Sequence, residues 1–273
     1  QQDVDAALAE DIGTGDATAD LLPADLRMQA QLLCREHAVL AGRAWFDACF
    51  RELDVDIVVD WRFDDGDRIP AGSYVCSLKG KARALVAAER SALNFLQTLS
   101  GTATATARYC DAVAGSRLRI LDTRKTLPGL RHAQKYAVRC GGGSNHRMGL
   151  YDAILVKENH IAAAGGIDAA VRLARVRFPD LPLEVEVESL HELDQALACG
   201  VPRVLLDEFS LDDMREAVRR SSGIAELEVS GGVELEGLAD IAATGVDYVS
   251  IGALTKHVRA VDFSLRLRTL PQT

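Results

Sequence analysis

Charged and polar side chains follow six short apolar runs in the second half of the chain. The runs read LRILDTRK, AILVKENH, LEVEVES, RVLLDEFS, LEVSGG and DYVSIGA. Each run has strand length, and helical pattern separates most of them, which predicts parallel βα repeats that close into a barrel. The functional site of such a barrel lies at the carboxyl ends of its strands. We therefore expect Arg124, Lys125, Lys157, Glu186 and Asp207 to face one cavity.

Basic residues concentrate between residues 117 and 157, in a chain whose net charge is −9. This stretch holds nine Lys and Arg residues against two Asp residues, a local charge of +7. Nucleic-acid binding is disfavoured, because a phosphate backbone calls for a broad basic surface. A local basic segment in an acidic protein favours a small polyanionic ligand.

The adjacent cations Arg124 and Lys125 end a predicted strand, where like charges are costly unless an anion lies between them. A guanidinium group suits a carboxylate or a phosphate. The GGGSNHR segment offers flexible backbone and free amides for an anion, followed by His146 and Arg147. Lys157 ends the next strand. A lysine side chain seldom points into a protein unless a partner compensates its charge. By contrast, the basic residues at 131, 135 and 139 share one helix face, which we expect to be solvent-exposed.

Acidic side chains alternate with apolar ones in LEVEVES, so Glu184, Glu186 and Glu188 point to one side of that strand. Inward-facing glutamates need cations or a metal opposite them. Glu186 and Asp207 are expected on adjacent strands. They could form ion pairs with Arg124 or Lys157, act on the substrate, or do both, pairing at rest and acting when substrate binds. The loops at 230–232 and 250–253 follow the last two strands, where barrels commonly bind phosphate through backbone amides.

The first 80 or so residues predict an α+β unit with an open sheet, built from strands at MQAQLLCRE, VDIVVDWRF and SYVCSLKGKA and a helix from about Ala41. A long helical segment follows, which Gly101 is expected to break in two. A further helix is expected to start at Thr126, with Pro128 in its first turn and Gly141 after its end. One more extended or helical segment is predicted at VDFSLRLRTL.

Composition narrows the class of protein. The apolar content of 48% is ordinary for a globular chain of 273 residues, and no apolar run reaches the roughly 18 residues of a membrane span. No signal peptide is visible, and because the first residue is Gln1 we expect the natural start to lie upstream. The six scattered cysteines are expected to be free thiols in a reducing cytoplasm.

Several of these segments together resemble the quinolinate phosphoribosyltransferase family. The matching segments run over nearly the whole chain: EDIGTGDAT, ERSALNFLQTLSG, DTRKTLPGLR, KYAVRCGGGSNHRMGLYDAILVKENH, EVEVES, LLDEFS, SGG and VSIGALTKHVRAVDFSLRL. The resemblance implies an α/β fold with an N-terminal α/β sandwich domain and an incomplete α/β barrel of roughly seven strands. We expect the sandwich domain at 1–100, joined by the tail 258–273, and the barrel with the active site at 101–257.

The resemblance also implies an activity: phosphoribose passes from phosphoribosyl pyrophosphate to quinolinate, with loss of pyrophosphate and CO2, giving nicotinate mononucleotide in NAD biosynthesis. It implies catalytic roles for Lys125, Glu186 and Asp207. Implied substrate contacts are Arg90, Thr123, Arg124, Lys125, His146, Arg147, Lys157, Ser230, Gly231, Gly232, Ser250, Gly252 and Ala253. Mg2+ would be held mainly by the substrate pyrophosphate, with Glu186 and Asp207 as further contacts. The protein would be a homodimer or larger, with Arg90 reaching the neighbouring subunit's site.

Two positions depart from the family pattern: Thr102 stands where Ile is usual, and Glu208 where the family often has Asn, which leaves the role of Asp207 open. The GTATAT run at 101–106 imitates a phosphate loop but lies in a helical apolar context, which indicates packing. Other classes stay open on the residues alone. They are a Schiff-base aldolase that uses Lys157, a non-catalytic anion-binding barrel, and a nicotinate-specific or molybdenum-transport relative.

Overall fold

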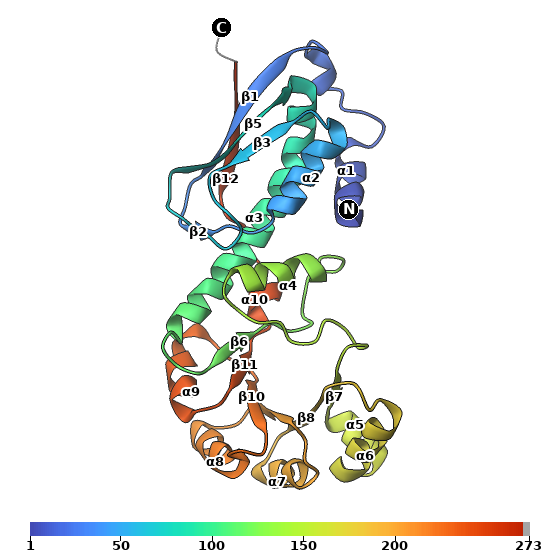
Figure 1. The fold of residues 1–273 in the computed structure, drawn as a ribbon, viewed down its shortest axis with the longest axis vertical. Coiled ribbons are helices and arrows are strands. Elements are labelled where there is room, and N and C mark those ends of the chain that lie inside the picture. The colour runs from blue at the N-terminus through green and yellow to red at the C-terminus, as the bar shows by residue number, and fades with distance from the viewer. Residues whose placement is uncertain (270–273) are drawn as a thin grey trace. The chain divides into compact units, whose positions relative to one another are not determined.

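The computed structural model describes residues 1–269, which form two compact units (Figure 1). Unit 1 combines 1–107, 127–142 and the described residues from Leu254 on, and unit 2 combines 108–126 and 143–253. Within 1–269 no helix combines the length and apolar character that a membrane crossing requires. The division differs from the expected domains in three segments, 101–107, 127–142 and 254–257, which lie within the expected barrel range but group with unit 1. The last residues of the expected tail, 270–273, lie outside the described residues.

Unit 1 holds an antiparallel sheet in the order β12-β1-β5-β3. Its strands are β1 Arg27–Cys34, β3 Val58–Trp61, β5 Ser73–Lys81 and β12 Phe263–Thr269, and β2 Ala38–Val39 pairs with β4 Arg68–Ile69. Its helices are α1 Gln2–Ile12, the 3-10 turn η1 Ala19–Leu21, α2 Arg43–Leu53 and the start of α3 Ala82–Ala112. One face of the sheet packs on these helices through a core that includes Leu32, Leu78, Phe46 and Phe50.

Helix α3 runs unbroken through Gly101, so the expected break is wrong. A Cβ atom at this position would lie 2.2 Å from the carbonyl oxygen of Arg259, within unit 1. Gly101 therefore permits close backbone approach and does not end the helix. The neighbouring Thr102 and Thr106 are fully buried, which fits the packing interpretation of GTATAT.

The segment around helix α4, Arg131–Cys140, shows why it belongs to unit 1. Ala133 and Ala137 of α4 pack with Leu99 and Ala103 of α3. The helix begins at Arg131 and not at Thr126, while Gly141 ends it as expected. Lys135 is completely buried, so the prediction of a solvent-exposed basic face is wrong for this residue.

Unit 2 is an incomplete parallel barrel. Its six strands follow the order β6-β11-β10-β9-β8-β7: β6 Arg119–Leu121, β7 Ile154–Val156, β8 Leu183–Val187, β9 Arg203–Asp207, β10 Glu226–Ser230 and β11 Tyr248–Ser250. A parallel bridge from Leu121 to Ser144 continues the sheet beyond β6, in the place of the expected seventh strand. Among residues 1–269, therefore, six strands and one bridge replace the expected seven.

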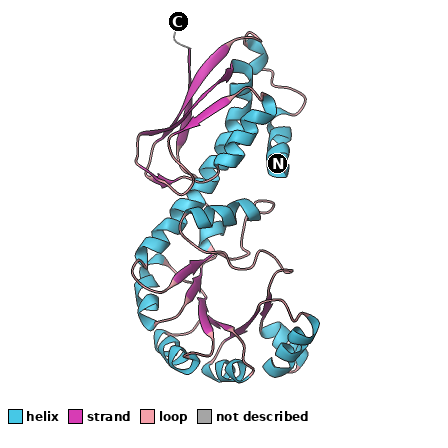
Figure 2. Ribbon diagram, viewed as in Figure 1, coloured by secondary structure: helices cyan, strands magenta, loops and turns pink. Residues whose placement is uncertain are grey.

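Helices follow the barrel strands along the chain and cover the outside of the sheet (Figure 2). They are α5 Glu158–Ala164, α6 Ile167–Arg177, α7 Leu190–Ala198, α8 Leu211–Ser221 and α9 Leu238–Thr244, which the 3-10 turn η2 Leu235–Gly237 precedes. The short helix α10 Ala253–Lys256 follows β11, and from Leu254 on it groups with unit 1. Ser189 and Ser210 cap α7 and α8 through their side chains, which fixes sharp turns after β8 and β9. Parallel pairing places the carboxyl ends of all these strands along one edge.

Candidate active site

A cavity of about 180 Å³, here called the site cavity, opens among residues at this edge of unit 2. Five of its lining residues are basic or histidine: Arg124, Lys125, His146, Arg147 and Lys157. Four others were also expected at the site: Thr123, Glu186, Ser230 and Ser250. Three lining residues were not expected there: Leu155, Leu205 and Glu228. A larger cavity of about 370 Å³ lies near Arg117, Gly223 and Asp247, at the opposite ends of the strands, away from this cluster.

Arg124 and Arg147 bring like charges to the same cavity. Burial lowers the pKa of Arg147, and the nearby charge of Arg124 lowers it further. The backbone N–H of Lys125 donates to the Thr123 hydroxyl oxygen at 3.0 Å, which shapes the turn after β6. Such a pair of guanidinium groups is matched by an anion that accepts hydrogen bonds from both.

Asp122, which is completely buried, holds the loop that carries His146 and Arg147. Its carboxylate accepts from the Asn145 side chain at 2.5 Å and from the backbone N–H of His146 at 2.9 Å. Asp152 fixes the far end of the same loop by accepting from the backbone of Met148 at 2.7 Å. The sequence offered no local signal for Asp122, because its role depends on the loop packing back onto β6.

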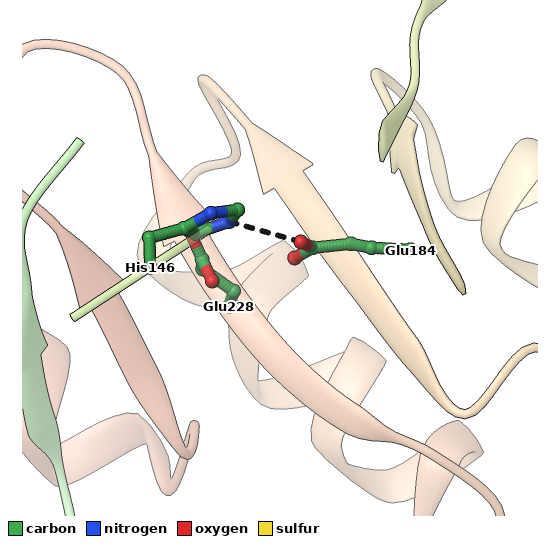
Figure 3. A group of neighbouring side chains, drawn as sticks. All are labelled: His146, Glu184 and Glu228. Atoms are coloured by element: carbon green, nitrogen blue, oxygen red, sulfur yellow. Dashed lines mark hydrogen bonds and ion pairs between the residues drawn. The ribbon is translucent and has the colours of Figure 1, made fainter. Parts of the chain in front are cut away.

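His146 reaches the cavity with both ring nitrogens engaged. Its Nδ1 accepts the backbone N–H of Arg147 at 2.7 Å, and its Nε2 lies 3.0 Å from Glu184 and 3.5 Å from Glu228 (Figure 3). A backbone N–H can only donate, so Nδ1 is unprotonated and the ring proton lies on Nε2. The expected contact between His146 and substrate stays a prediction.

His146, Glu184 and Glu228 offer three ligand atoms within 4.8 Å of one another, a set that could in principle bind a metal ion. A metal would need the lone pair of Nε2, and the Arg147 N–H places the ring proton on that atom. The hydrogen bonds thus favour a proton shared between the ring and Glu184 over a metal ion.

Glu186 is nearly buried on β8 and forms an ion pair with Lys157 at the end of β7. Burial raises the pKa of Glu186, the Lys157 cation opposes that rise, and the charge of Asp207 adds to it. Glu188, by contrast, lies beyond the end of β8 and is exposed, so only two of the three alternating glutamates face inward.

Asp207 ends β9 beside Ser230 of β10 and is half-buried. It does not line the site cavity, although its charge is felt by Glu186. The next residue, Glu208, is the one non-glycine residue within 1–269 with a positive φ, 56°. Asn adopts this backbone more readily than Glu, so the substitution carries strain as well as charge.

The glycines expected to bind phosphate have different surroundings. Gly231 and Gly232 have φ of 97° and 54°, conformations that suit glycine, and neither lines the site cavity. Ala253 begins α10 and also lies outside the lining, while Arg90 lies on α3 in unit 1. The roles of these residues stay predictions.

Gly252 allows Lys125 to reach its place, because a Cβ at 252 would lie 2.8 Å from Lys125 Cδ. We predict that Gly252→Ala displaces this side chain and weakens sulfate binding by about tenfold, with little change in melting temperature. Gly237→Ala is the matched control, since nothing lies within 4 Å of a Cβ there. Equal sulfate affinity in both variants, measured by calorimetry, would contradict this role of Gly252.

Comparison with known proteins gives matches over both units. The family model for the quinolinate phosphoribosyl transferase N-terminal domain matches residues 16–100, and that for the C-terminal domain matches residues 102–266. The chain is 44% identical over 271 residues to nicotinate-nucleotide pyrophosphorylase [carboxylating] of Mycobacterium leprae, covering 96% of this chain and 94% of that protein. A probable nicotinate-nucleotide pyrophosphorylase [carboxylating] of Bacillus subtilis is 39% identical, with 94% and 89% covered.

The three-dimensional structure also matches a protein of this name. The solved structure of the nicotinate-nucleotide pyrophosphorylase from Francisella tularensis has a TM-score of 0.95 and 46% identity, with coverage of 97% of this chain and 94% of that one. The two family models together match residues 16–100 and 102–266, which include parts of both units. The chain belongs to the quinolinate phosphoribosyltransferase family.

Proposed function

We propose that this protein transfers the phosphoribosyl group of phosphoribosyl pyrophosphate to the ring nitrogen of quinolinate, releasing pyrophosphate and CO2 and forming nicotinate mononucleotide. Family membership supports the reaction class. The observation that carries it is that Arg124, Lys125, Arg147 and Lys157 line one cavity together with the nearly buried carboxylate of Glu186.

Both substrates are polyanions, and the four cations supply the attraction that overcomes their mutual repulsion. Arg124 and Arg147 suit a carboxylate or phosphate held between them, because each guanidinium can donate two parallel hydrogen bonds. Lys125, which lines the same cavity, is proposed to hold the carboxylate that is lost. Thr123 supports the turn from which Arg124 and Lys125 extend.

Glu186 serves the donor sugar. At rest its charge is balanced by Lys157. When a quinolinate carboxylate takes Lys157 as its partner, the Glu186 carboxylate becomes free to face the ribose. As pyrophosphate leaves, positive charge develops on the anomeric carbon, and a carboxylate held in a dry site stabilises it. Asp207, whose charge reaches Glu186, adds to the same negative field.

The ring nitrogen bonds to the anomeric carbon as the bond from that carbon to pyrophosphate breaks. The bond between the neighbouring ring carbon and its carboxylate then breaks: CO2 leaves, the bonding electron pair stays on the ring carbon beside the cationic nitrogen, and a proton from water takes the place of the carboxylate. The decarboxylation therefore needs no protein-bound cofactor. Ser230 and Ser250 line the cavity beside Glu228, and their strand ends, with Gly231, Gly232, Gly252 and Ala253, are proposed to bind the 5′-phosphate.

Mg2+ is proposed to enter with the pyrophosphate. The residues present fit this arrangement, because Glu186 and Asp207, the two carboxylates proposed as further contacts, are too few to hold the ion without the pyrophosphate oxygens. Bound there, the ion would neutralise the leaving pyrophosphate. We also propose that the protein forms a homodimer or a larger assembly, in which Arg90 of one subunit reaches the neighbouring site, and that it works in a reducing cytoplasm. The six cysteines, all free thiols in the structure, support a reducing compartment.

The choice of acceptor tests this function. Purified protein with phosphoribosyl pyrophosphate and Mg2+ should form nicotinate mononucleotide from quinolinate far faster than from nicotinate, because two substrate carboxylates use more of the cations. Chromatography measures the mononucleotide formed from each acceptor. Faster formation from nicotinate than from quinolinate would point to a nicotinate-specific enzyme. Inactivation by borohydride with a carbonyl substrate would instead favour a Schiff base on Lys157.

A further inference from the structure

Glu228 is a completely buried acid in the wall of a cavity built for anions. It lies in the middle of β10, between β9 and β11, opposite Leu205 and Tyr248. No step of the proposed reaction uses Glu228. A carboxylate removed from water costs several kcal/mol unless cations and hydrogen bonds compensate its charge.

The groups that face Glu228 come from four elements. Glu184 of β8 lies on one side, and His146 Nε2 is 3.5 Å away. Arg203 of β9 is 4.0 Å away and Ser250 lies on β11. Within residues 1–269 no group stands in hydrogen-bond geometry with either carboxylate oxygen, although the Ser250 hydroxyl is close enough to lower the pKa.

His146 and Arg203 offset a negative charge on Glu228 only in part. The Nδ1 atom of His146 accepts a backbone N–H, and its Nε2 lies closer to Glu184, at 3.0 Å, than to Glu228, at 3.5 Å. Arg203 is shared with Glu226 at 3.1 Å and stacks on Tyr248, 4.1 Å from its ring centroid. An ionised Glu228 would therefore stand beside the charge of Glu184 with only partial compensation. Burial, and then the charge of Glu184, raise the pKa of Glu228 to about 7, while His146, Ser250 and Arg203 counter part of that rise.

We propose that Glu228 works as a neutral carboxylic acid and that its ionisation lowers the affinity of the site cavity for anions. Protonated, the side chain adds no charge to the wall formed with Arg124, Arg147 and Lys157. Ionised, it places a negative charge in a low-dielectric wall, where Coulomb repulsion of a polyanion is strong. This inference rests on the proposed function for its choice of quinolinate as the probe.

The direction with pH follows from linkage. Anion binding favours the protonated side chain, so binding draws a proton onto Glu228 when the pH exceeds its pKa. The dissociation constant should then rise by up to about tenfold per pH unit above that pKa. Below it, affinity should not depend on this group. Glu228→Gln keeps the shape of the neutral acid and cannot ionise.

The test is calorimetric titration of the full-length protein with quinolinate between pH 6 and 8.5 at constant ionic strength. Wild type should lose affinity as pH rises, whereas Glu228→Gln should keep the affinity that wild type shows at low pH. Glu236→Gln, the same change at an exposed position of unit 2, should behave as wild type. A Glu228→Gln variant with the wild-type pH slope would overturn the role of Glu228.

A second measurement does not depend on any variant folding. Titrations of wild type at pH 7.5 in two buffers of different ionisation enthalpy count the protons taken up on binding, and most of one proton is expected. Sulfate, which does not titrate in this range, serves as a second probe. If sulfate binds with proton uptake and quinolinate does not bind, the proposed acceptor is wrong and the role of Glu228 stands. Binding of both anions without proton uptake, or of neither, overturns that role.

Discussion

Glu186→Gln should lower kcat by about 10²- to 10³-fold while leaving the melting temperature within a few degrees of wild type. The glutamine keeps the size of the side chain but not the negative charge that stabilises the developing positive charge on the ribose. Glu186 sits on β8 among completely or nearly buried residues, so its position is fixed before substrate binds. The measurement is steady-state formation of nicotinate mononucleotide, with thermal unfolding alongside.

Glu188→Gln, two residues along the same segment, is the matched control, because Glu188 is exposed beyond the strand end. It should keep activity close to wild type. Equal activity losses in the two variants, or a loss in Glu186→Gln that tracks a fall in melting temperature, would show that Glu186 has no specific part in the reaction.

Lys157→Met should cause a second large loss, in both quinolinate affinity and turnover. The cation that receives a quinolinate carboxylate is gone, and Glu186 loses its partner. Burial raises the pKa of Glu186 and Lys157 opposes that rise, so the pKa climbs further in the variant. Because the ionised form of Glu186 is the active one, activity is lost as pH falls through this pKa, and the loss begins at higher pH in Lys157→Met.

The pH profile of kcat/KM, which reports the pKa values of the free enzyme, separates these effects. Lys157→Arg retains the positive charge and should keep the acidic limb near its wild-type position, even if the rate is lower. An acidic limb that does not move in Lys157→Met would mean that Lys157 does not influence the pKa of Glu186 in the free enzyme.

The sequence predicted the site residues whose charged side chains end or directly follow a strand. Arg124, Lys125, Lys157 and Glu186 each end or follow an apolar run, and parallel pairing alone brings strand ends to one edge. Glu228 was missed, although ELEVS shows the same alternation as LEVEVES and could have indicated a second inward-facing acid.

The other differences between the sequence predictions and the structure come from contacts between residues that lie far apart in the sequence. Gly101 reads locally as a helix break, and only the approach of the Arg259 carbonyl explains a glycine inside a continuous helix. The burial of Lys135 and the grouping of 127–142 with unit 1 likewise depend on packing that the segment's own pattern does not show. Asp122 acts through a loop more than twenty residues away.

The most direct measurement follows a carboxylate label. Quinolinate labelled in the carboxylate next to the ring nitrogen is incubated with the protein, Mg2+ and phosphoribosyl pyrophosphate. We predict one labelled CO2 for each nicotinate mononucleotide formed, and neither product when phosphoribosyl pyrophosphate is left out. Mononucleotide without labelled CO2, or no product at all, would contradict the conclusion that this cavity joins the two anions and drives the decarboxylation.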